Sequence, residues 1–202
     1  RGGYSTAAAA VAKTFGASME RGLGSLEGKK VTVLAGTGPV GQTAARIYAA
    51  EKADVTISSR SLAKGQIVAD KINKECGATR VKVVEVSKPE QTVQAIKDAE
   101  IILAAGAGGI QLLTQADLDQ APKCKIVGDI NAIKPLGVEG LGPNDDKEMK
   151  TGVWGIGALA IGKLKIKTEV EMIKRATAEP QGLFDYAIAY TIAKDQILKK
   201  LA

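Results

Sequence analysis

The sequence of 202 residues contains no histidine, only two cysteines and few aromatic side chains. Without histidine, the chain has no imidazole general base, no serine–histidine–aspartate triad and no histidine–cysteine zinc site. We expect no bound metal. Cys76 and Cys124 are far apart and lack CxxC spacing, which predicts a reducing, cytoplasmic compartment rather than a disulfide scaffold.

Long apolar runs are also absent. No run approaches the roughly 20 residues of a membrane span and we find no secretory signal peptide, so we expect no membrane partner. The net charge is +6, from 28 Lys and Arg against 22 Asp and Glu, but the lysines form no basic block. Aromatic residues for base stacking make up only 3%, so we expect no nucleic acid; the surplus fits an anionic small ligand equally well.

The residues that are abundant are small and aliphatic, which suits buried parallel strands between alanine-rich helices. Period-two and helical spacings alternate along the chain and predict an α/β fold, a Rossmann-like doubly wound parallel sheet with flanking helices. A Gly- and Pro-rich stretch at 131–144 predicts a long loop, and 151–167 a short strand before a helix. The expected strands are 30–35, 54–59, 80–86, 100–106 and 125–130; the expected helices are 6–20, 39–52, 62–75, 89–98 and 184–202, with Pro180 and Gly182 breaking the pattern before the last.

The turn G-T-G-P-V-G separates the first predicted strand from the next helix. In this setting Gly36 allows a tight turn, Gly38 lets a diphosphate touch the backbone, and Gly41 lets helix and strand pack closely. The helix N-terminus offers free N–H groups and a positive dipole end to the phosphates. The motif predicts a dinucleotide site; a tight turn without a ligand is the alternative. The predicted phosphate loop is Gly36, Thr37, Gly38, Pro39, Val40 and Gly41.

The end of the second predicted strand, S-S-R-S-L-A-K, indicates which dinucleotide binds. NAD-binding domains tend to carry an acid about 20 residues after the glycines, where it binds the ribose hydroxyls. Arg60 follows Gly41 by 19 residues and no acid is present, so pairing of arginine with a 2′-phosphate predicts NADP. We expect Ser59 to add a hydroxyl and Lys64 a second charge. A solvated helix start is the alternative for Arg60 and Lys64.

Two further strand ends should face the same crevice, because ligands of open parallel sheets bind beyond the carboxyl ends of the strands. The small residues of A-A-G-A-G-G, at 104–109, let ribose and nicotinamide lie against the backbone; a plain glycine-rich turn is the alternative. Asn131 can bond a carboxamide and Asp129 can hold a polar group, with loop capping by Asx turns as the alternative. The predicted contacts here are Ala105, Gly106, Ala107, Asp129 and Asn131.

Four longer stretches carry a resemblance to a known family: GSLEGKKVTVLAGTGPVGQTAA, SSRSLAKGQ, GDINAIKPLGVEGL and GIGALAIGKLKIK. The chain resembles the NADP-dependent methylene-tetrahydromethanopterin dehydrogenases of one-carbon metabolism, which are related in fold to methylene-tetrahydrofolate dehydrogenases. The resemblance covers essentially the whole chain. It implies that the family's phosphate, adenosine-phosphate and nicotinamide contacts fall on the residues named above.

The resemblance also implies a reaction. A methylene carbon between two nitrogens of a tetrahydropterin substrate gives a hydride to NADP, and the methenyl cation that forms is stabilised by the nitrogen lone pairs. No proton is taken from an alcohol, so the absence of histidine is compatible with this chemistry. Positioning of the two rings would supply most of the catalysis. The catalytic residue is unknown, because Lys163, Lys165 and Lys167 alternate as a solvated face does.

The start of the chain implies an organisation in three parts. The chain begins at Arg1 inside a helical pattern, and family members carry an N-terminal domain, so we expect a fragment or a processed chain. Residues 1–28 would be an interdomain-type helix and linker. Residues 29–178 would form the NADP-binding domain, and 179–202 a C-terminal helix that packs back toward the first helix.

Two other functions fit the same pattern. A shikimate-dehydrogenase-like NADP oxidoreductase would also suit S-R-x-x-x-K after the second strand, although it needs a Lys and Asp pair in a further domain. A non-catalytic NADP-binding module is the second. The apolar faces of the first and last helices predict a homo-oligomer wherever they are exposed.

Overall fold

Strands and helices alternate through the computed structural model, which describes residues 2–178, 182 and 184–202. The first half contains α1 (Gly2–Glu20), β1 (Lys30–Leu34), α2 (Pro39–Ala50), β2 (Asp54–Ser59), α3 (Leu62–Cys76) and β3 (Val81–Glu85). The second half contains the 3-10 helix η1 (Pro89–Gln91), α4 (Thr92–Ile96), β4 (Ile101–Ala104), α5 (Gln115–Asp119), β5 (Ile126–Asp129), β6 (Asp146–Glu148), β7 (Trp154–Ile156), α6 (Ala158–Ala178) and α7 (Tyr186–Leu201).

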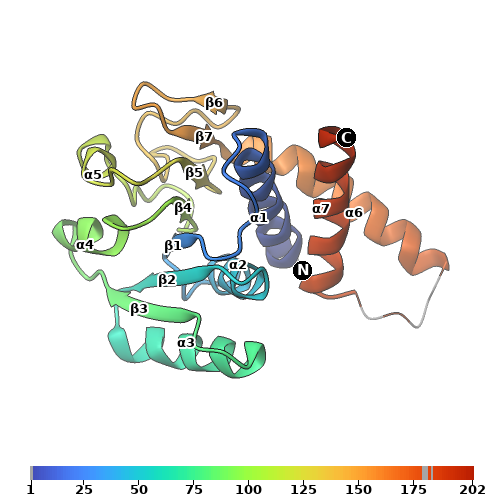
Figure 1. Ribbon diagram of the computed structural model, residues 1–202, viewed down its shortest axis with the longest axis horizontal. Coiled ribbons are helices and arrows are strands. Elements are labelled where there is room, and N and C mark those ends of the chain that lie inside the picture. The colour runs from blue at the N-terminus through green and yellow to red at the C-terminus, as the bar shows by residue number, and fades with distance from the viewer. Residues whose placement is uncertain (1, 179–181, 183) are drawn as a thin grey trace.

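The strands form one seven-stranded sheet in the order β3-β2-β1-β4-β5-β7-β6. All neighbouring strands are parallel except β6 and β7. Figure 1 shows α4 and α5 on one side of the sheet and α1, α6 and α7 on the other. The predicted Rossmann-like α/β fold is confirmed, with an antiparallel strand added at one edge.

Each central strand is buried on both faces and supplies alternate residues to two cores. Val31 and Val33 of β1 belong to the larger core beneath α1 and α2, whereas Leu34 belongs to the smaller core beneath α4 and α5. Ile101 and Ile102 of β4 divide between the two cores in the same way. This division follows from the period of two along a strand, and it explains why the strands read as continuous apolar runs.

The alanine-rich helix α1 is the most deeply enclosed helix, and α2, α6 and α7 pack around it (Figure 1). Its small side chains allow close approach, and a Cβ added at Gly16 would lie 2.7 Å from a methyl carbon of Ile197 in α7. The apolar faces of α1 and α7 therefore cover each other in this chain. The homo-oligomer that we expect wherever these faces are exposed therefore gains no support from α1 and α7 and stays a prediction.

Three short elements differ from the sequence-based expectation. The helix expected at 89–98 is a 3-10 turn followed by five residues of α-helix, and it ends at Ile96. The helix α5 and the strand β6 were not expected, because five residues and three charged residues show no readable apolar period. The first helix begins at Gly2, and Pro180 lies outside the described residues.

Candidate functional site

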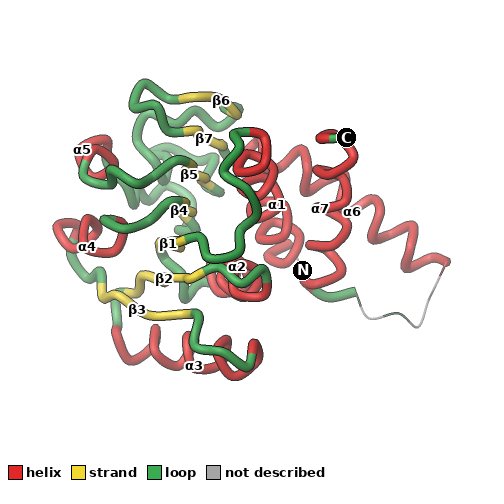
Figure 2. The backbone as a smooth tube through the Cα atoms, in the orientation of Figure 1, coloured by secondary structure: helices red, strands yellow, loops and turns green. Residues whose placement is uncertain are grey.

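The carboxyl ends of four parallel strands lie along one edge of the sheet and carry every residue of the predicted site. Leu34 at the end of β1 pairs with Ala104 at the end of β4, and Ala104 pairs with Asp129 at the end of β5. The register of β1 with β2 places Ser59 on the other side of β1. The predicted phosphate, nicotinamide-side and adenosine-side residues are thus brought to adjacent loops of this edge, where Figure 2 shows the strands passing into loops.

Two glycines of the predicted phosphate loop are explained by packing within the chain. A Cβ added at Gly36 would lie 2.5 Å from the Cβ of Ile57, and one at Gly41 would lie 2.6 Å from the carbonyl oxygen of Ala35. Real Cβ atoms do not approach other atoms so closely. Gly36 therefore lets the turn lie against β2, and Gly41 lets α2 lie against the turn, as predicted from the motif.

The middle glycine, Gly38, has no such internal reason. It has an ordinary extended backbone, with φ −71° and ψ 164°, and an added Cβ would meet only the Ala35 carbonyl oxygen, at 3.5 Å. Gly38 is the N-cap of α2, and Pro39 occupies the first turn, where the missing N–H costs nothing. The N–H groups of Val40 and Gly41 have no helical partner, as at every helix start. A backbone without a side chain thus lies at the positive end of a helix dipole.

Sequence reasoning did not single out Ala35, the residue before the glycines. Ala35 has φ 55°, in the left-handed region that favours glycine. Its N–H donates to the Ser58 hydroxyl at 2.9 Å, and the next N–H, of Gly36, donates to the Ser58 carbonyl at 2.9 Å. One buried serine of β2 therefore holds the entry to the glycine turn in place.

The end of β2 places two cations at the surface. Arg60 and Lys64 are exposed, and among the described residues no carboxylate lies within salt-bridge distance of either. Ser61 caps α3 through its hydroxyl, which accepts from the Lys64 N–H at 3.4 Å. Gly65 then packs tightly, since an added Cβ would lie 2.4 Å from a methyl of Val83. This contact fixes the start of α3, and with it the backbone of Lys64, against the sheet.

Ser59 differs from Arg60 and Lys64, because the Ser59 hydroxyl already makes hydrogen bonds within the chain. It donates to the carbonyl oxygen of Ser61 at 2.8 Å and accepts from the Ser61 N–H at 3.2 Å. Ser59 is also buried, with 5% of its surface exposed. The hydroxyl shapes the turn that presents Arg60.

The loop after β4 begins with the small residues Ala105, Gly106 and Ala107. Ala105 is buried, and its N–H donates to the Leu34 carbonyl at 3.0 Å, next to the glycine turn. A Cβ added at Gly106 would lie 2.8 Å from a methyl of Leu112, so the Leu112 side chain packs against this glycine. Ala107 is exposed. The three residues present a small-residue backbone beside the glycine turn.

Asp129 is buried at the end of β5 and accepts hydrogen bonds from the loop that follows. Its carboxylate oxygens accept from the N–H groups of Asn131 at 2.9 Å and Val138 at 3.1 Å. Burial raises the pKa of Asp129 above its ordinary value of 3.8, while hydrogen bonds from Asn131, Val138 and Gly137 act to lower it. The carboxylate organises the backbone of residues 131–138.

The amide of Asn131 joins two loops of the site edge. Its oxygen accepts from the N–H of Ile133 at 2.8 Å and of Gly109 at 3.3 Å, and its nitrogen donates to the Pro135 carbonyl at 2.9 Å. The Lys134–Pro135 peptide within this loop is cis. The contacts of Asn131 and Asp129 are those of loop capping, the alternative that the sequence left open.

The described part of the chain was also compared with the requirements of a metal centre and of a membrane span. Within residues 2–178, 182 and 184–202, no group of three His, Cys, Asp or Glu side chains is placed to hold a metal ion. Lys165 lies 3.7 Å from Glu169 on the same helix, whereas Lys163 and Lys167 are exposed. No helix among the described residues is long and apolar enough to cross a bilayer.

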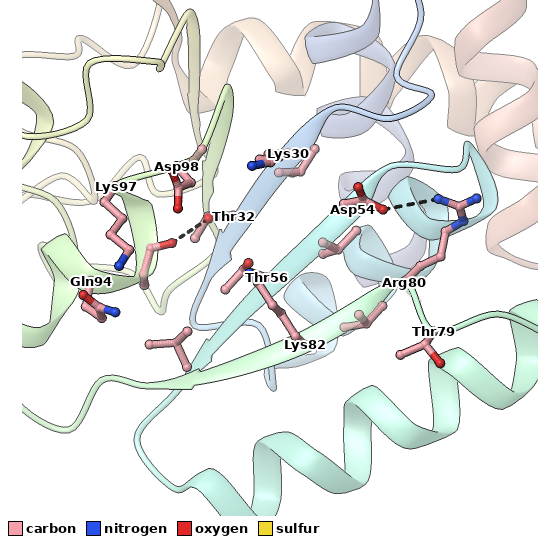
Figure 3. A pocket seen from close by; sticks show the side chains of 16 residues that line it. Lys30, Thr32, Asp54, Thr56, Thr79, Arg80, Lys82, Gln94, Lys97 and Asp98 are labelled. Carbon is pink, nitrogen blue, oxygen red and sulfur yellow. Dashed lines mark hydrogen bonds and ion pairs between the residues drawn. The ribbon is translucent and has the colours of Figure 1, made fainter.

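A separate hollow lies away from these residues. It measures about 570 Å³ and lies on the face of β1, β2 and β3 beside the short helix α4 (Figure 3). Lys30 and Asp54, the first residues of β1 and β2, line it, so it opens toward the amino ends of the strands. Asp54 is paired with Arg80 at 3.3 Å, and the Thr32 hydroxyl donates to the Ala95 carbonyl at 2.8 Å. This hollow contains none of the predicted site residues.

Comparison with known proteins places the chain among dehydrogenases. A protein-family model described as shikimate / quinate 5-dehydrogenase matches residues 17–133. The bifunctional protein MdtA of Methylorubrum extorquens is 38% identical over 194 residues, 96% of this chain and 66% of that protein. An NAD(P)-dependent methylenetetrahydromethanopterin dehydrogenase of the same organism is 35% identical over 198 residues, 95% of this chain and 66% of that protein.

The chain therefore spans about two thirds of the length of the curated relatives that it matches. Among solved structures, a transhydrogenase from Sinorhizobium meliloti has a TM-score of 0.60 over 98% of this chain and 54% of that chain, at 17% identity. This likeness concerns the fold alone. By its family match, and by relatives that align with nearly all of this chain, the chain belongs to the NAD(P)-binding shikimate / quinate 5-dehydrogenase family and is a homologue of NAD(P)-dependent methylenetetrahydromethanopterin dehydrogenase.

Proposed function

We propose that the chain is the NADP-binding part of an oxidoreductase that moves a hydride from a methylene-tetrahydropterin to NADP. The substrate would be methylene-tetrahydromethanopterin or methylene-tetrahydrofolate, and the product its methenyl form. The support is the homology to a methylenetetrahydromethanopterin dehydrogenase over 95% of the chain. That relative is an NAD(P)-dependent enzyme by name, so the choice of NADP rests on this chain's own residues.

The observation that carries the proposal is the room for a Cβ at Gly38. Packing within the chain requires glycine at 36 and 41 but not at 38, where an added Cβ would make one ordinary contact, with the Ala35 carbonyl oxygen at 3.5 Å. A diphosphate against this backbone supplies that reason, because its oxygens would accept from the first N–H groups of α2 without a side chain between them. The residues present therefore fit a dinucleotide. When bound, oxidised NADP supplies a hydride acceptor.

The preference for NADP is assigned to Arg60, with Lys64 as a second charge. Both side chains are exposed and lie beyond the end of β2, where the sheet edge presents the adenosine side of a dinucleotide. A guanidinium next to a 2′-phosphate makes charge-assisted hydrogen bonds, which NAD cannot offer. Ser59 is proposed to hold the turn that presents Arg60, because its hydroxyl bonds to Ser61.

The nicotinamide side is assigned to the loops after β4 and β5. Ala105, Gly106 and Ala107 carry only small side chains or none. Asp129 and Asn131 are proposed as positioning residues, which hold residues 131–138 and tie them to Gly109. The chain then contributes by orientation rather than by proton transfer, since a hydride leaving a carbon between two nitrogens needs no general base.

Homo-oligomer formation is assigned to α6, because its exposed apolar side chains recur along one helix face. These side chains are those of Leu159, Ile166, Val170 and Ile173. Light scattering at micromolar concentration tests whether the protein is an oligomer.

The proposed cytoplasmic location rests on two free cysteines, Cys76 and Cys124.

A shikimate-dehydrogenase-like activity is the second candidate, because that family model matches residues 17–133. Assays with different hydride donors distinguish the two candidate activities, with NADPH formation measured by its absorbance. We expect methylene-tetrahydromethanopterin or methylene-tetrahydrofolate to reduce NADP, and we expect shikimate to give no reduction. Reduction by shikimate alone would overturn the pterin assignment. Tight NADP binding with no turnover from any of the three donors would favour a non-catalytic binding module.

A further inference from the structure

A second concave surface, which we call the lysine hollow, lies between α1, α6, α7 and the segment that leads into β6. Its volume is about 480 Å³. Five lysines line it: Lys13 of α1, Lys163 and Lys167 of α6, and Lys199 and Lys200 of α7. Helix α1 and the two consecutive helices α6 and α7 thus bring positive charge to one place.

The single carboxylate in the lining, Asp146, does not neutralise this charge. It accepts a hydrogen bond from the Lys13 ammonium, and its other oxygen accepts from the Trp154 indole N–H at 3.1 Å. Among the described residues, no acid lies within salt-bridge distance of the other four lysines. The lining therefore holds five positive side chains and one negative one.

A solvated surface accounts poorly for the lysines of α6. Lys163 and Lys167 are four residues apart on one helix face, where like charges repel. On the same helix Lys165 has an acid partner, Glu169, at the corresponding spacing. The helix dipole favours Lys199 and Lys200 in the last turn of α7, but it gives no support to Lys163 and Lys167. Their repulsion is relieved most simply by an anion between the helices.

Apart from the five lysines and Asp146, the residues that line the hollow are uncharged. Ala160, Leu164 and Ile197 form an apolar part of the lining. Gln196 also lines the hollow.

We propose that the lysine hollow is a binding site for a small anion that carries at least two phosphate or carboxylate groups. Two or more anionic groups match lysines that come from three different helices, and the confined volume favours a small molecule over an extended polymer. The hollow shares no residue with the glycine turn, the end of β2 or the loops after β4 and β5. The proposal therefore does not rest on the proposed function.

Calorimetric titration with pyrophosphate and with citrate tests the site, at about 0.15 M salt and with NADP at saturation to occupy the dinucleotide site. Pyrophosphate represents a phosphate ligand and citrate a carboxylate ligand. We expect the Lys163→Gln/Lys167→Gln variant to bind the preferred probe at least tenfold more weakly than the unmodified protein. A matched control, Lys71→Gln/Lys88→Gln, removes the same charge from exposed positions elsewhere and should bind within twofold of the unmodified protein.

Two further measurements separate a site from general charge attraction. The Lys163→Arg/Lys167→Arg variant should retain binding, because the charge remains. The only tryptophan, Trp154, is joined to Lys13 through Asp146, so its fluorescence should change on binding in the unmodified protein. Equal losses in the two glutamine variants, or no binding of either probe by the unmodified protein, would overturn the proposal. The dinucleotide proposal is unaffected by either result, since NADP affinity is measured separately.

Discussion

The N–H of Ala35 and the hydroxyl of Ser58 form a hydrogen bond of 2.9 Å that joins the end of β1 to β2. It holds Ala35 at φ 55°, a conformation that costs an L-residue roughly 1–2 kcal/mol. The glycine turn begins at the next residue, and its first N–H donates to the Ser58 carbonyl. The shape of the glycine turn therefore depends on a serine that the glycine motif does not include.

Replacing this serine should destabilise the fold. The Ser58→Ala substitution leaves the Ala35 N–H without its partner, which costs about 1–3 kcal/mol of unfolding free energy. Urea denaturation followed by circular dichroism measures it. Ser87→Ala is the matched control, because the Ser87 hydroxyl bonds to Gln91 at an exposed position; its effect should stay within about 0.5 kcal/mol. Equal effects of the two substitutions would show that Ser58 does not hold the turn.

Substitutions at two glycines should have opposite consequences. Gly41→Ala places a Cβ 2.6 Å from the Ala35 carbonyl oxygen, so the fold should lose about 1–3 kcal/mol. Gly38→Ala has room within the chain, so stability should change by less than about 1 kcal/mol while NADP affinity falls. Thermal unfolding and NADP titration of both variants separate the effects. Unchanged NADP binding by Gly38→Ala would remove the reason for placing a diphosphate there.

The stability contribution of Asp129 should depend on pH in an unusual direction for a carboxylate. Burial raises its pKa in the folded protein above the ordinary value of 3.8. Its contribution is therefore fully present below that ordinary value and is lost as the pH rises through the raised pKa. The Asp129→Asn variant lacks this titration, so the stability lost by the substitution should be larger at pH 4 than at pH 7. Denaturant unfolding at both pH values checks this, and a larger loss at pH 7 would contradict it.

Much of the fold was readable from the sequence, because the central strands are buried on both faces and the first helices begin at clear signals. The strand Asp54–Ser59 has the bounds that the sequence predicted, and Pro39 and Leu62 begin helices where expected. The edge strand β6 was not readable. Its three residues are exposed and charged, and only pairing with β7 makes them a strand.

The candidate site was less readable, because polar side chains can bond to the backbone as well as to a ligand. A sequence shows that Ser59 follows a strand but not that its hydroxyl turns back to Ser61. It also leaves open whether Asp129 and Asn131 face a ligand or cap a loop, and the hydrogen bonds are those of a capped loop. The left-handed backbone of Ala35 had no signal at all, since alanine rarely adopts it.

The central claim is that Arg60 recognises the 2′-phosphate of a dinucleotide held at Gly38. Its most direct test is calorimetric titration of the unmodified protein and the Arg60→Ala variant with NADP and with NAD. Loss of the charge-assisted contact should weaken NADP binding by about 1.5–3 kcal/mol and leave NAD binding nearly unchanged. Equal losses for both dinucleotides, or no loss for NADP, would contradict the claim.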